Sequence, residues 1–394
     1  MPGPVVLPLL LLCALLLSAC SAPRSGSPSA GPGGAPGSAT PSPSAAPPPP
    51  SCVDTLLTTL PLRQLAGQLL IVGSPLGAAV QPSLDLIKKL PVGGVLLTGR
   101  SRQGVAAVAA RTAALQKANS AGAGLLIAAD QEGGQVQTLT GPGFSAIPTA
   151  VEQGRWSSQR LITAAAKWGA ELKAAGVRLD LAPVSDVLSA QLGSADLAVG
   201  VSHRTFGTEP GSVGASVLAF TAGLAQSDVA GAVKHFPGLG RVGPNTDLTA
   251  NVHDTTTSVD SPWLDPFRRA VDAGVPVVMV SSAIYTQIDP TQLAAFSRPV
   301  ITDLLRTRMG FNGVVISDDL GKAVAVAAVP VADRAVRFVA AGGDIVLTAS
   351  PDTAPAMLEG LVAKATADPD FAATVRAAAR RVLTAKQALH LLPC

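Results

Sequence analysis

The chain has 394 residues, of which 47% are apolar and 14% are charged, and its formal net charge is +3. This length suits one large domain or two modest ones, and the apolar content predicts a well-buried globular core. The small net charge argues against nucleic acid or an anionic surface as the main partner. No run of Lys and Arg is interleaved with aromatic residues, so we expect no nucleic-acid binding.

The first 19 residues are typical of a lipoprotein signal peptide. Val5 to Leu17 is apolar but too short to span a bilayer, which suits the hydrophobic part of a signal. The run ends in a lipobox pattern, Leu17-Ser-Ala-Cys20. Cleavage before Cys20 would leave its thiol to carry a diacylglycerol anchor, and a secretory signal with a chance cysteine is the alternative. The missing Lys or Arg ahead of Val5 leaves the start codon open.

Residues 20–51 are expected to be a disordered tether. From Ser21 to Ser51 the chain is almost entirely Pro, Ser, Gly and Ala, with Arg24 as its only charge. Such a segment cannot bury enough apolar surface to offset the entropy lost on ordering. We therefore expect a domain over residues 52–394 that is lipid-anchored in the cell membrane and faces the cell-wall side.

The cysteines agree with export. Cys13 would leave with the signal and Cys20 would be acylated, which leaves Cys52 and Cys394 at the two ends of the predicted domain. In an oxidising compartment these two can form a disulfide if the fold brings its termini together. Two unrelated thiols are the alternative.

From residue 53 onward, eight short apolar runs each have a polar or Gly-rich end and alternate with Ala-rich stretches. The expected strands are Leu69–Gly73, Gly94–Gly99, Leu125–Asp130, Leu179–Val187, Gly231–Gly238, Val275–Ala283, Gly313–Leu320 and Asp344–Ala349. The expected helices include Val105–Ala121, Ser158–Ala175, Gly211–Gln226, Trp263–Ala273 and Val331–Ala341. Continuous apolar runs indicate strands buried on both faces, and their alternation with helices predicts a (β/α)8 barrel. A doubly wound sheet is the alternative, although no Gly-x-Gly-x-x-Gly follows the first strand.

Polar residues collect at the carboxyl ends of five of these strands. They are Asp130 to Gly134, Asp186, Lys234-His235, Ser281-Ser282 and Ser317-Asp318-Asp319. A single polar residue at a strand end can be the N-cap of the next helix. Barrel enzymes build their active sites on this face, so the convergence of five strand ends predicts a functional site.

Three motifs, taken in this order, resemble glycoside hydrolase family 3: Asp130-Gln-Glu-Gly-Gly134, Lys234-His-Phe-Pro-Gly238 and Ile316-Ser-Asp-Asp-Leu320. Within that family they are most similar to the single-domain NagZ-type β-N-acetylglucosaminidases, and among these to the actinobacterial lipoprotein (LpqI-like) members. The likeness covers about residues 53–390, and it includes Leu181-Ala-Pro-Val184 with Asp186, Arg204-Thr-Phe-Gly207 and Ala341-Gly-Gly-Asp-Ile345.

The resemblance implies a retaining mechanism in which Asp318 is the nucleophile and forms a glycosyl-enzyme. It also implies that four side chains bind the hydroxyls of the sugar whose bond is cleaved: Asp130, Arg204, Lys234 and His235. We interpret Asp186 as a supporting residue that orients Lys234 or His235. Salt bridges that merely close the barrel rim are the structural alternative and are compatible with binding. The sequence lacks zinc-type Cys/His spacing and a calcium loop, and the implied chemistry needs no cofactor and no metal.

The loop after the fifth strand departs from the family pattern. NagZ-type enzymes have Lys-His-Phe-Pro-Gly-His-Gly followed by Asp-Ser-His, whose last His is the general acid/base. Here Leu239 replaces the loop His, and Asn245-Thr-Asp247 occupies the Asp-Ser-His positions. Asp247 is the candidate acid/base if burial and Asp318 raise its pKa, and His253 is the alternative. A third possibility is a catalytically impaired lipoprotein that only binds sugar.

Two further expectations concern specificity. Gln135 stands where most relatives have Arg after the paired glycines, and the loss of charge leaves the sugar preference open. An anionic Asp247 would repel phosphate, which favours hydrolysis over phosphorolysis. We predict a monomer that releases non-reducing terminal GlcNAc from peptidoglycan-derived fragments. A family 3 β-glucosidase or phosphorylase is the alternative.

Overall fold

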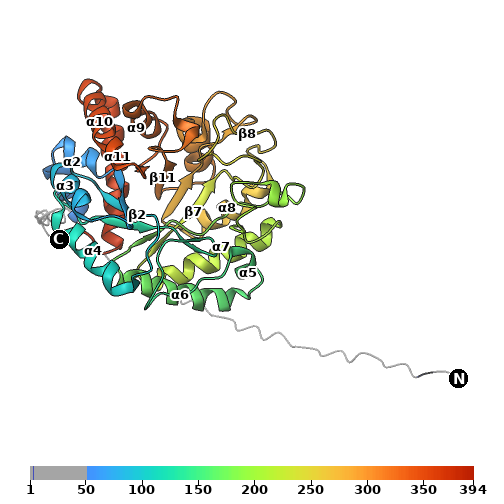
Figure 1. Ribbon diagram of the computed structural model, residues 1–394. Helices are drawn as coiled ribbons and strands as arrows, with labels where there is room; N and C mark the ends of the chain where they lie inside the picture. The colour runs from blue at the N-terminus through green and yellow to red at the C-terminus, as the bar shows by residue number, and fades with distance from the viewer. Residues whose placement is uncertain (1–2, 4–50) are drawn as a thin grey trace, which may run out of the picture. The chain divides into compact units, whose positions relative to one another are not determined.

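Eight parallel strands close into a barrel in which each strand is bonded to its neighbours along the chain (Figure 1). The computed structural model describes residue 3 and residues 51–394, and Pro50–Cys394 is one compact unit. The strands are β1 (Leu70–Pro75), β2 (Gly94–Thr98), β3 (Leu126–Ala129), β6 (Leu179–Asp180), β7 (Ala230–Phe236), β9 (Val277–Val280), β11 (Val314–Asp319) and β12 (Ile345–Thr348). The predicted (β/α)8 barrel is confirmed, and the alternative doubly wound sheet is wrong because the sheet has no open edge. The predicted signal peptide, the lipidation site Cys20 and nearly all of the tether lie outside the described residues.

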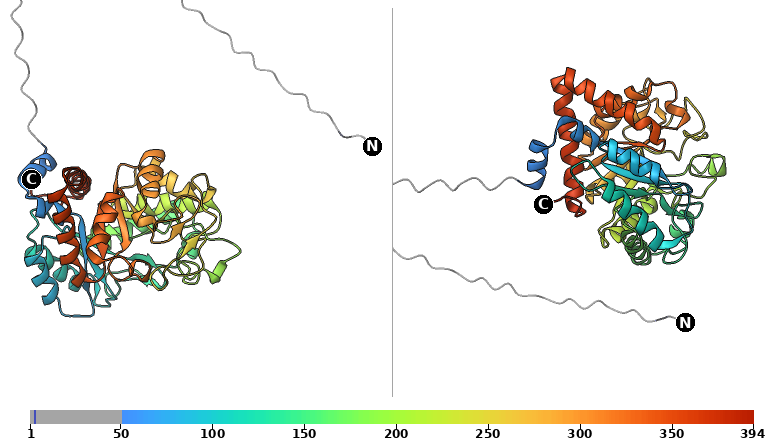
Figure 2. Two further views of the ribbon diagram at one scale, coloured as in Figure 1. Left: turned by 90° about the horizontal axis from the view of Figure 1, so that it is seen from above. Right: turned by 60° about the vertical axis from the view of Figure 1, so that its left-hand side comes forward.

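Helices surround the barrel on its outer face (Figures 1 and 2). They are α1 (Cys52–Thr59), α2 (Leu62–Gly67), α3 (Gln81–Lys89), α4 (Gly104–Ala118), α5 (Ala150–Gln153), α6 (Ser158–Ala174), α7 (Pro210–Ala225), α8 (Asp265–Asp272), the π-helical η4 (Pro299–Arg308), α9 (Val331–Ala340), α10 (Ala354–Ala367) and α11 (Pro369–Ala388). Two short two-stranded sheets lie in the loops, and they are formed by β4 (Gln131–Gly133) with β5 (Val136–Gln137) and by β8 (His253–Asp254) with β10 (Ile284–Tyr285). Within residues 51–394, no helix is both long and apolar enough to cross a bilayer.

The barrel has one core inside it and another between its strands and helices. Alternate residues along a strand point to opposite faces, so Ile71 packs inside while its neighbours Leu70 and Val72 pack against the helices. The strand residues of the inner core are Ile71, Leu96, Leu126, Ala128, Leu179, Ala230, Ala232, Val277, Met279, Val314, Ile316, Ile345 and Leu347. Because both faces are apolar, the strands have the continuous apolar runs seen in the sequence.

The fourth strand is much shorter than predicted. The expected strand was Leu179–Val187, whereas β6 ends at Asp180. Pro183 has no N–H to donate to a neighbouring strand, so the ladder is interrupted there. Pairing resumes only at an isolated bridge between Val184 and Lys234. The irregular segment that follows delivers Asp186 to the carboxyl end of the barrel.

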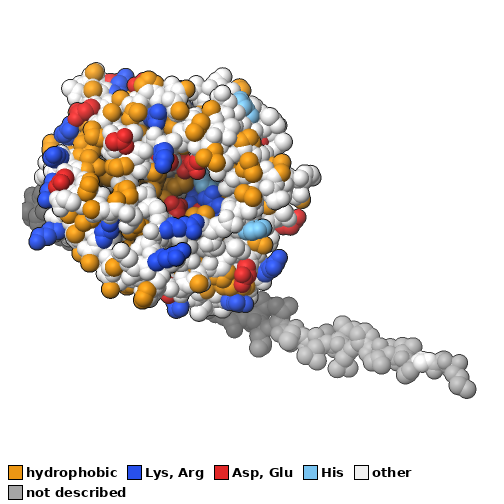
Figure 3. Space-filling view, in the orientation of Figure 1, with side chains coloured by type: hydrophobic (Ala, Val, Ile, Leu, Met, Phe, Trp, Pro, Cys, Tyr) orange, Lys and Arg blue, Asp and Glu red, His pale blue; other side chains and the backbone are white. Residues whose placement is uncertain are grey.

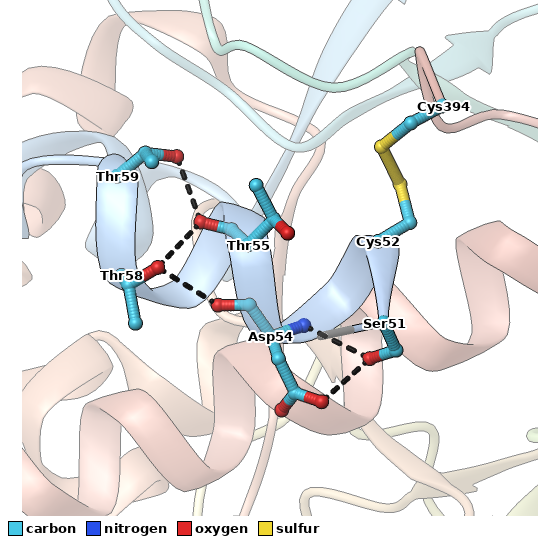
Figure 4. The surroundings of a disulfide bond; sticks show 7 residues. All are labelled: Ser51, Cys52, Asp54, Thr55, Thr58, Thr59 and Cys394. Atoms are coloured by element: carbon cyan, nitrogen blue, oxygen red, sulfur yellow. Dashed lines mark hydrogen bonds between the residues drawn. A yellow bond between two sulfur atoms is a disulfide. The ribbon is translucent and has the colours of Figure 1, made fainter. Parts of the chain in front are cut away.

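A disulfide joins the two ends of the domain, as the sequence predicted. Cys52 begins α1 and bonds to Cys394 with a Cα–Cα distance of 5.8 Å (Figure 4), within the usual range for a disulfide. Helix α1 packs against α11, which brings the N-terminal end of the domain beside its C-terminal helix (Figure 2). Ser51 caps α1 by accepting a hydrogen bond from the backbone N–H of Asp54 at 3.1 Å.

Replacing both Cys52 and Cys394 with Ser is expected to lower the free energy of unfolding by about 2–5 kcal/mol, because the bridge restricts the unfolded chain. Urea denaturation of the two proteins measures this difference. A reducing agent should shift the wild-type midpoint by a similar amount and leave the double variant unchanged. Equal midpoints for the wild type and the variant would contradict a stabilising role.

Candidate active site

A cavity of about 710 Å³ opens at the carboxyl ends of the barrel strands. Figure 3 shows it as a central hollow in which acidic and basic side chains meet. Six residues that the sequence singled out for catalysis or binding line it together: Asp130, Arg204, Lys234, His235, Asp247 and Asp318. The fold therefore brings to one place side chains that are up to 188 residues apart (from 130 to 318).

Two adjacent carboxylates, Asp318 and Asp319, lie at the end of β11 and differ in the number of hydrogen bonds that they accept. Asp319 accepts hydrogen bonds from the backbone N–H groups of Gly321 (2.8 Å), Ala349 (2.9 Å) and Lys322 (3.2 Å), so it fixes the loops after β11 and β12. Asp318 accepts only from the N–H of Asp319, at 2.9 Å. Its other oxygen has no hydrogen-bond partner within the described chain, so this carboxylate is free to contact a ligand in the cavity.

An ionic cluster forms one wall of the cavity. Lys234 Nζ lies 2.8 Å from Asp130 Oδ1 and 2.6 Å from Glu132 Oε1. The guanidinium of Arg204 binds both oxygens of Glu132, with Nε at 2.8 Å and Nη2 at 2.7 Å. The Asp130 side chain keeps 33% of its surface exposed, so it can still accept hydroxyl donors from a ligand. The pair Lys234–Asp130 thus combines a rim salt bridge with a surface suited to binding sugar.

The charges of this cluster stabilise one another. Burial alone would raise the pKa of Glu132, but Arg204 and Lys234 outweigh it and lower the pKa to about 2. Burial also disfavours the charge of Lys234, yet Asp130 and Glu132 raise its pKa above the ordinary value. Glu132 and Lys234 are therefore both charged at neutral pH, and their ion pairs fix the cluster in place before a ligand arrives.

Glu132 was not predicted as a site residue, although it stands inside the first motif, two positions after Asp130. It is buried, and it holds both cations of the cluster. Asp180 was also missed. Burial raises the pKa of Asp180 to about 8 even though it accepts a hydrogen bond from the N–H of Gln131. The sequence could have pointed to Glu132, because it is a second carboxylate only two residues after Asp130. Nothing in the sequence distinguishes Asp180 from an ordinary residue at the end of a strand.

Replacing Glu132 with Gln is expected to lower the free energy of unfolding by about 3–5 kcal/mol, because it leaves Arg204 and Lys234 buried without their shared partner. Chemical denaturation measures the loss. The matched control is Asp265→Asn, which breaks the more exposed pair with Arg269 and should cost about 1 kcal/mol or less. A loss for Glu132→Gln no larger than for the control would contradict the account of the cluster.

Asp186 is fully buried and orients His235. It accepts from the ring Nδ1 of His235 at 2.8 Å, from the backbone N–H of His235 at 3.0 Å and from the N–H of Leu239 at 3.0 Å. Because Nδ1 donates to the carboxylate, Nε2 is the ring nitrogen left for the cavity. The sequence interpretation had Asp186 supporting Lys234 or His235, and the contacts select His235.

The loop that carries Asp247 is held by two kinds of hydrogen bond. The side chain of Asn245 accepts from the N–H of Asp247 at 2.8 Å. The loop after β11 donates from Val324 N–H to the carbonyl of Asp247 and from Ala325 N–H to the carbonyl of Thr246, both at 3.1 Å. Asn245 thus fixes the backbone at Asp247, and the loop after the Asp318 strand holds the same segment.

Asp247 lies at the mouth of the cavity and has a raised pKa. Asp247 forms part of the cavity wall, so neighbouring protein atoms surround it on one side while its other side remains exposed to solvent. This partial burial, followed by the nearby charge of Asp318, raises its pKa to about 6. A carboxyl group with that pKa can donate a proton under mildly acidic conditions, as a general acid must.

His253 does not join the cavity. It belongs to β8, its side chain is exposed, and it is not one of the cavity-lining residues. The carboxylate of the next residue, Asp254, accepts from the N–H groups of Thr256 and Thr257, both at 2.7 Å, and is buried in that turn. The structure therefore does not bring His253 together with Asp318.

The guanidinium of Arg100 lies beside Gln135, the residue that replaces the Arg expected from the family pattern. Gln135 is exposed and lines the cavity, and its backbone carbonyl accepts a hydrogen bond from Arg100, which follows β2 and lines the same cavity. Positive charge is thus present at this part of the rim although Gln135 carries none. In the part of the chain that the structure describes, no group of three His, Cys, Asp or Glu side chains could hold a metal ion.

A barrel whose carboxyl-end cavity combines Asp318, a carboxyl group of raised pKa and an array of charged hydrogen-bonding groups has the features of a carboxylate glycosidase. Residues 62–385 match the glycosyl hydrolase family 3 N terminal domain. The chain belongs to glycoside hydrolase family 3 and is a glycoside hydrolase.

Related proteins extend the comparison. A β-hexosaminidase of Bordetella pertussis is 36% identical over 280 residues, which are 68% of this chain and 76% of the relative. The crystal structure of a β-N-acetylhexosaminidase from Beutenbergia cavernae is 49% identical, covers 83% of this chain and 99% of its own, and has a TM-score of 0.80. Mycobacterium tuberculosis LpqI is 27% identical over 86% of this chain and 96% of its own, with a TM-score of 0.73. The resemblance seen in the sequence motifs is confirmed.

Proposed function

We propose that the protein is a retaining exo-β-N-acetylglucosaminidase that hydrolyses non-reducing terminal GlcNAc residues. The observation that carries the proposal is the joint placement of Asp318 and Asp247 on one cavity beside a pre-formed array of sugar-binding groups. The names of the relatives described above, a β-hexosaminidase and a β-N-acetylhexosaminidase, support the choice of sugar.

In the first step, Asp318 attacks the anomeric carbon while Asp247 donates its proton to the glycosidic oxygen, and the aglycone leaves as an alcohol. The ionic cluster holds the sugar through its hydroxyls, with Lys234 and Arg204 as donors and with Asp130 and the Nε2 atom of His235 as acceptors. Since these groups are already fixed by Glu132 and Asp186, little reorganisation is needed when the substrate binds.

In the second step the roles change because the charges change. Formation of the ester with the sugar removes the negative charge of Asp318, which is one of the two main causes of the raised pKa of Asp247. The pKa of Asp247 then falls, so this residue is an ionised base that takes a proton from water as the water attacks the anomeric carbon. An anionic Asp247 repels a phosphate dianion, which favours water as the acceptor.

The cellular setting is proposed from the N-terminal sequence. The lipobox at Cys20 supports a lipid anchor in the cell membrane and a domain that faces the cell wall. Peptidoglycan-derived fragments with terminal GlcNAc are then the proposed substrates, and the catalytic unit is proposed to act as a monomer. Cys20→Ser should move the full-length protein from the membrane fraction to the soluble fraction on ultracentrifugation. An unchanged membrane fraction would contradict the anchor.

A comparison of chromogenic β-GlcNAc and β-glucoside substrates, each in phosphate-free and phosphate buffers, tests the proposal. We expect faster release from the β-GlcNAc substrate and free GlcNAc as the sugar product in both buffers. Faster release from the β-glucoside would support the alternative that the protein is a family 3 β-glucosidase. Formation of GlcNAc 1-phosphate would identify a phosphorylase. No release from any substrate would leave the sugar-binding alternative.

A further inference from the structure

The large apolar side chains exposed within residues 51–394 gather around one loop. They are Leu197, Val201, Leu248 and Val324, with exposed fractions of 54%, 47%, 76% and 39%. Backbone hydrogen bonds tie their segments to loop 243–248, from Leu197 N–H to the carbonyl of Gly243 at 2.8 Å and from Val324 N–H to the carbonyl of Asp247 at 3.1 Å. Single exposed leucines are common, but a group of apolar side chains beside a cavity marks a binding surface.

Only two of these four side chains line the active-site cavity, namely Leu248 and Val324. Both flank Asp247, because Leu248 follows it in the chain and the backbone of Val324 is bonded to its carbonyl. Leu197 and Val201 belong to the same neighbourhood but do not line the cavity. The exposed large apolar side chains that line the cavity therefore lie on either side of Asp247.

The position of this surface determines which part of a substrate it meets. Asp247 protonates the glycosidic oxygen, the atom that links the sugar to its leaving group. The sugar hydroxyls are held by the charged groups around Lys234 and Asp130, which offer little to an apolar ligand. Side chains next to Asp247 that are exposed at the cavity mouth thus face the aglycone (Figure 3 shows apolar side chains around the hollow).

We propose that Leu248 and Val324 form an apolar platform for the leaving-group side of the substrate, so that the enzyme prefers glycosides whose aglycone presents an apolar face beside the glycosidic oxygen. The C–H face of a pyranose ring or an alkyl group has this character. Packing of the aglycone on the platform removes apolar surface of both partners from water and holds the leaving oxygen at Asp247. This inference rests on the proposed glycosidase function.

The test compares ethyl and 2-cyclohexylethyl β-GlcNAc glycosides, whose leaving alcohols differ in apolar surface but hardly in acidity. The quantity measured is the ratio of kcat/KM for the cyclohexylethyl substrate over the ethyl substrate. The wild type should favour the larger aglycone, and Leu248→Ser should lower the ratio by roughly tenfold. Val324→Ser should lower it in the same direction. Leu197→Ser is the matched control, because it removes a similarly exposed leucine outside the cavity and should leave the ratio unchanged.

The outcomes separate this inference from the function on which it rests. Hydrolysis of both substrates with equal ratios in the wild type and Leu248→Ser would overturn the platform and leave the glycosidase intact. An equal fall of the ratio in Leu197→Ser would also overturn it, because the effect would not belong to the cavity. Failure of the wild type to hydrolyse either glycoside, or a chromogenic β-GlcNAc substrate, would overturn the proposed function and the platform with it.

Discussion

Asp318→Asn is expected to lower kcat/KM for a β-GlcNAc substrate by at least about 10³-fold, because Asp318 is the proposed nucleophile and an Asn side chain cannot form the glycosyl-enzyme. Asn keeps the shape of the side chain and its hydrogen bond with the N–H of Asp319, so the loss is assigned to the missing nucleophile. The neighbouring Asp319 cannot take over, since its two oxygens already accept three backbone N–H groups. Steady-state kinetics with a chromogenic glycoside measure the effect.

A stability measurement is the control that shows whether Asp318→Asn still folds normally. Asp318 lies at the cavity and has one hydrogen bond, so Asp318→Asn should unfold at nearly the same denaturant concentration as the wild type. Asp319→Asn should be less stable, because it weakens the hydrogen bonds through which the Asp319 side chain connects the loops after β11 and β12. A fully active Asp318→Asn protein would remove this residue from the mechanism.

Asp247→Asn is expected to reduce kcat/KM by about 10²–10⁴-fold for alkyl glycosides, whose leaving groups need a proton. The loss should be much smaller for glycosides of acidic phenols, since these leave without protonation. This dependence on the leaving group separates a general acid from a residue that only shapes the loop. Parallel kinetics on an alkyl and a nitrophenyl β-GlcNAc glycoside give the comparison.

The pH profile gives Asp247 a second signature. A general acid acts in its protonated form, so wild-type kcat/KM should fall as the pH rises through about 6, the pKa that burial and Asp318 impose on Asp247. Asp247→Asn has no proton to lose, and that alkaline limb should disappear. A wild-type rate in Asp247→Asn, or an unchanged limb, would exclude Asp247 as the acid. His253→Ala should leave the profile as it is, since His253 lies outside the cavity.

The architecture could be predicted because apolar content and strand order are local properties of the sequence. Both faces of the barrel strands are buried, so each strand is a continuous apolar run followed by polar residues at its carboxyl end. The exception is β6, where Pro183 interrupts the ladder and the predicted strand is too long. The helices named from the sequence did not include α3, η4, α10 or α11; of these, α3 is only nine residues long and has a Pro in its first turn.

The candidate site could be predicted only in part, because partners in space are not visible in the sequence. Motif positions identified Asp318 and Lys234, but the shared role of Glu132 depends on Arg204, which lies 72 residues away. The change of Asp-Ser-His to Asn245-Thr-Asp247 pointed to a new acid, whereas the function of Asn245 was hidden. Only the structure shows that the Asn245 side chain fixes the backbone N–H of Asp247.

The measurement that tests the central claim most directly is covalent trapping with a 5-fluoro-β-GlcNAc fluoride, followed by mass spectrometry of proteolytic peptides. The fluorine at C5 slows both steps, and the fluoride leaving group needs little acid assistance, so the glycosyl-enzyme should accumulate. We predict a single adduct on the peptide that contains Asp318, and no adduct in Asp318→Asn. A label on another residue, or turnover with no covalent species, would contradict a retaining mechanism through Asp318.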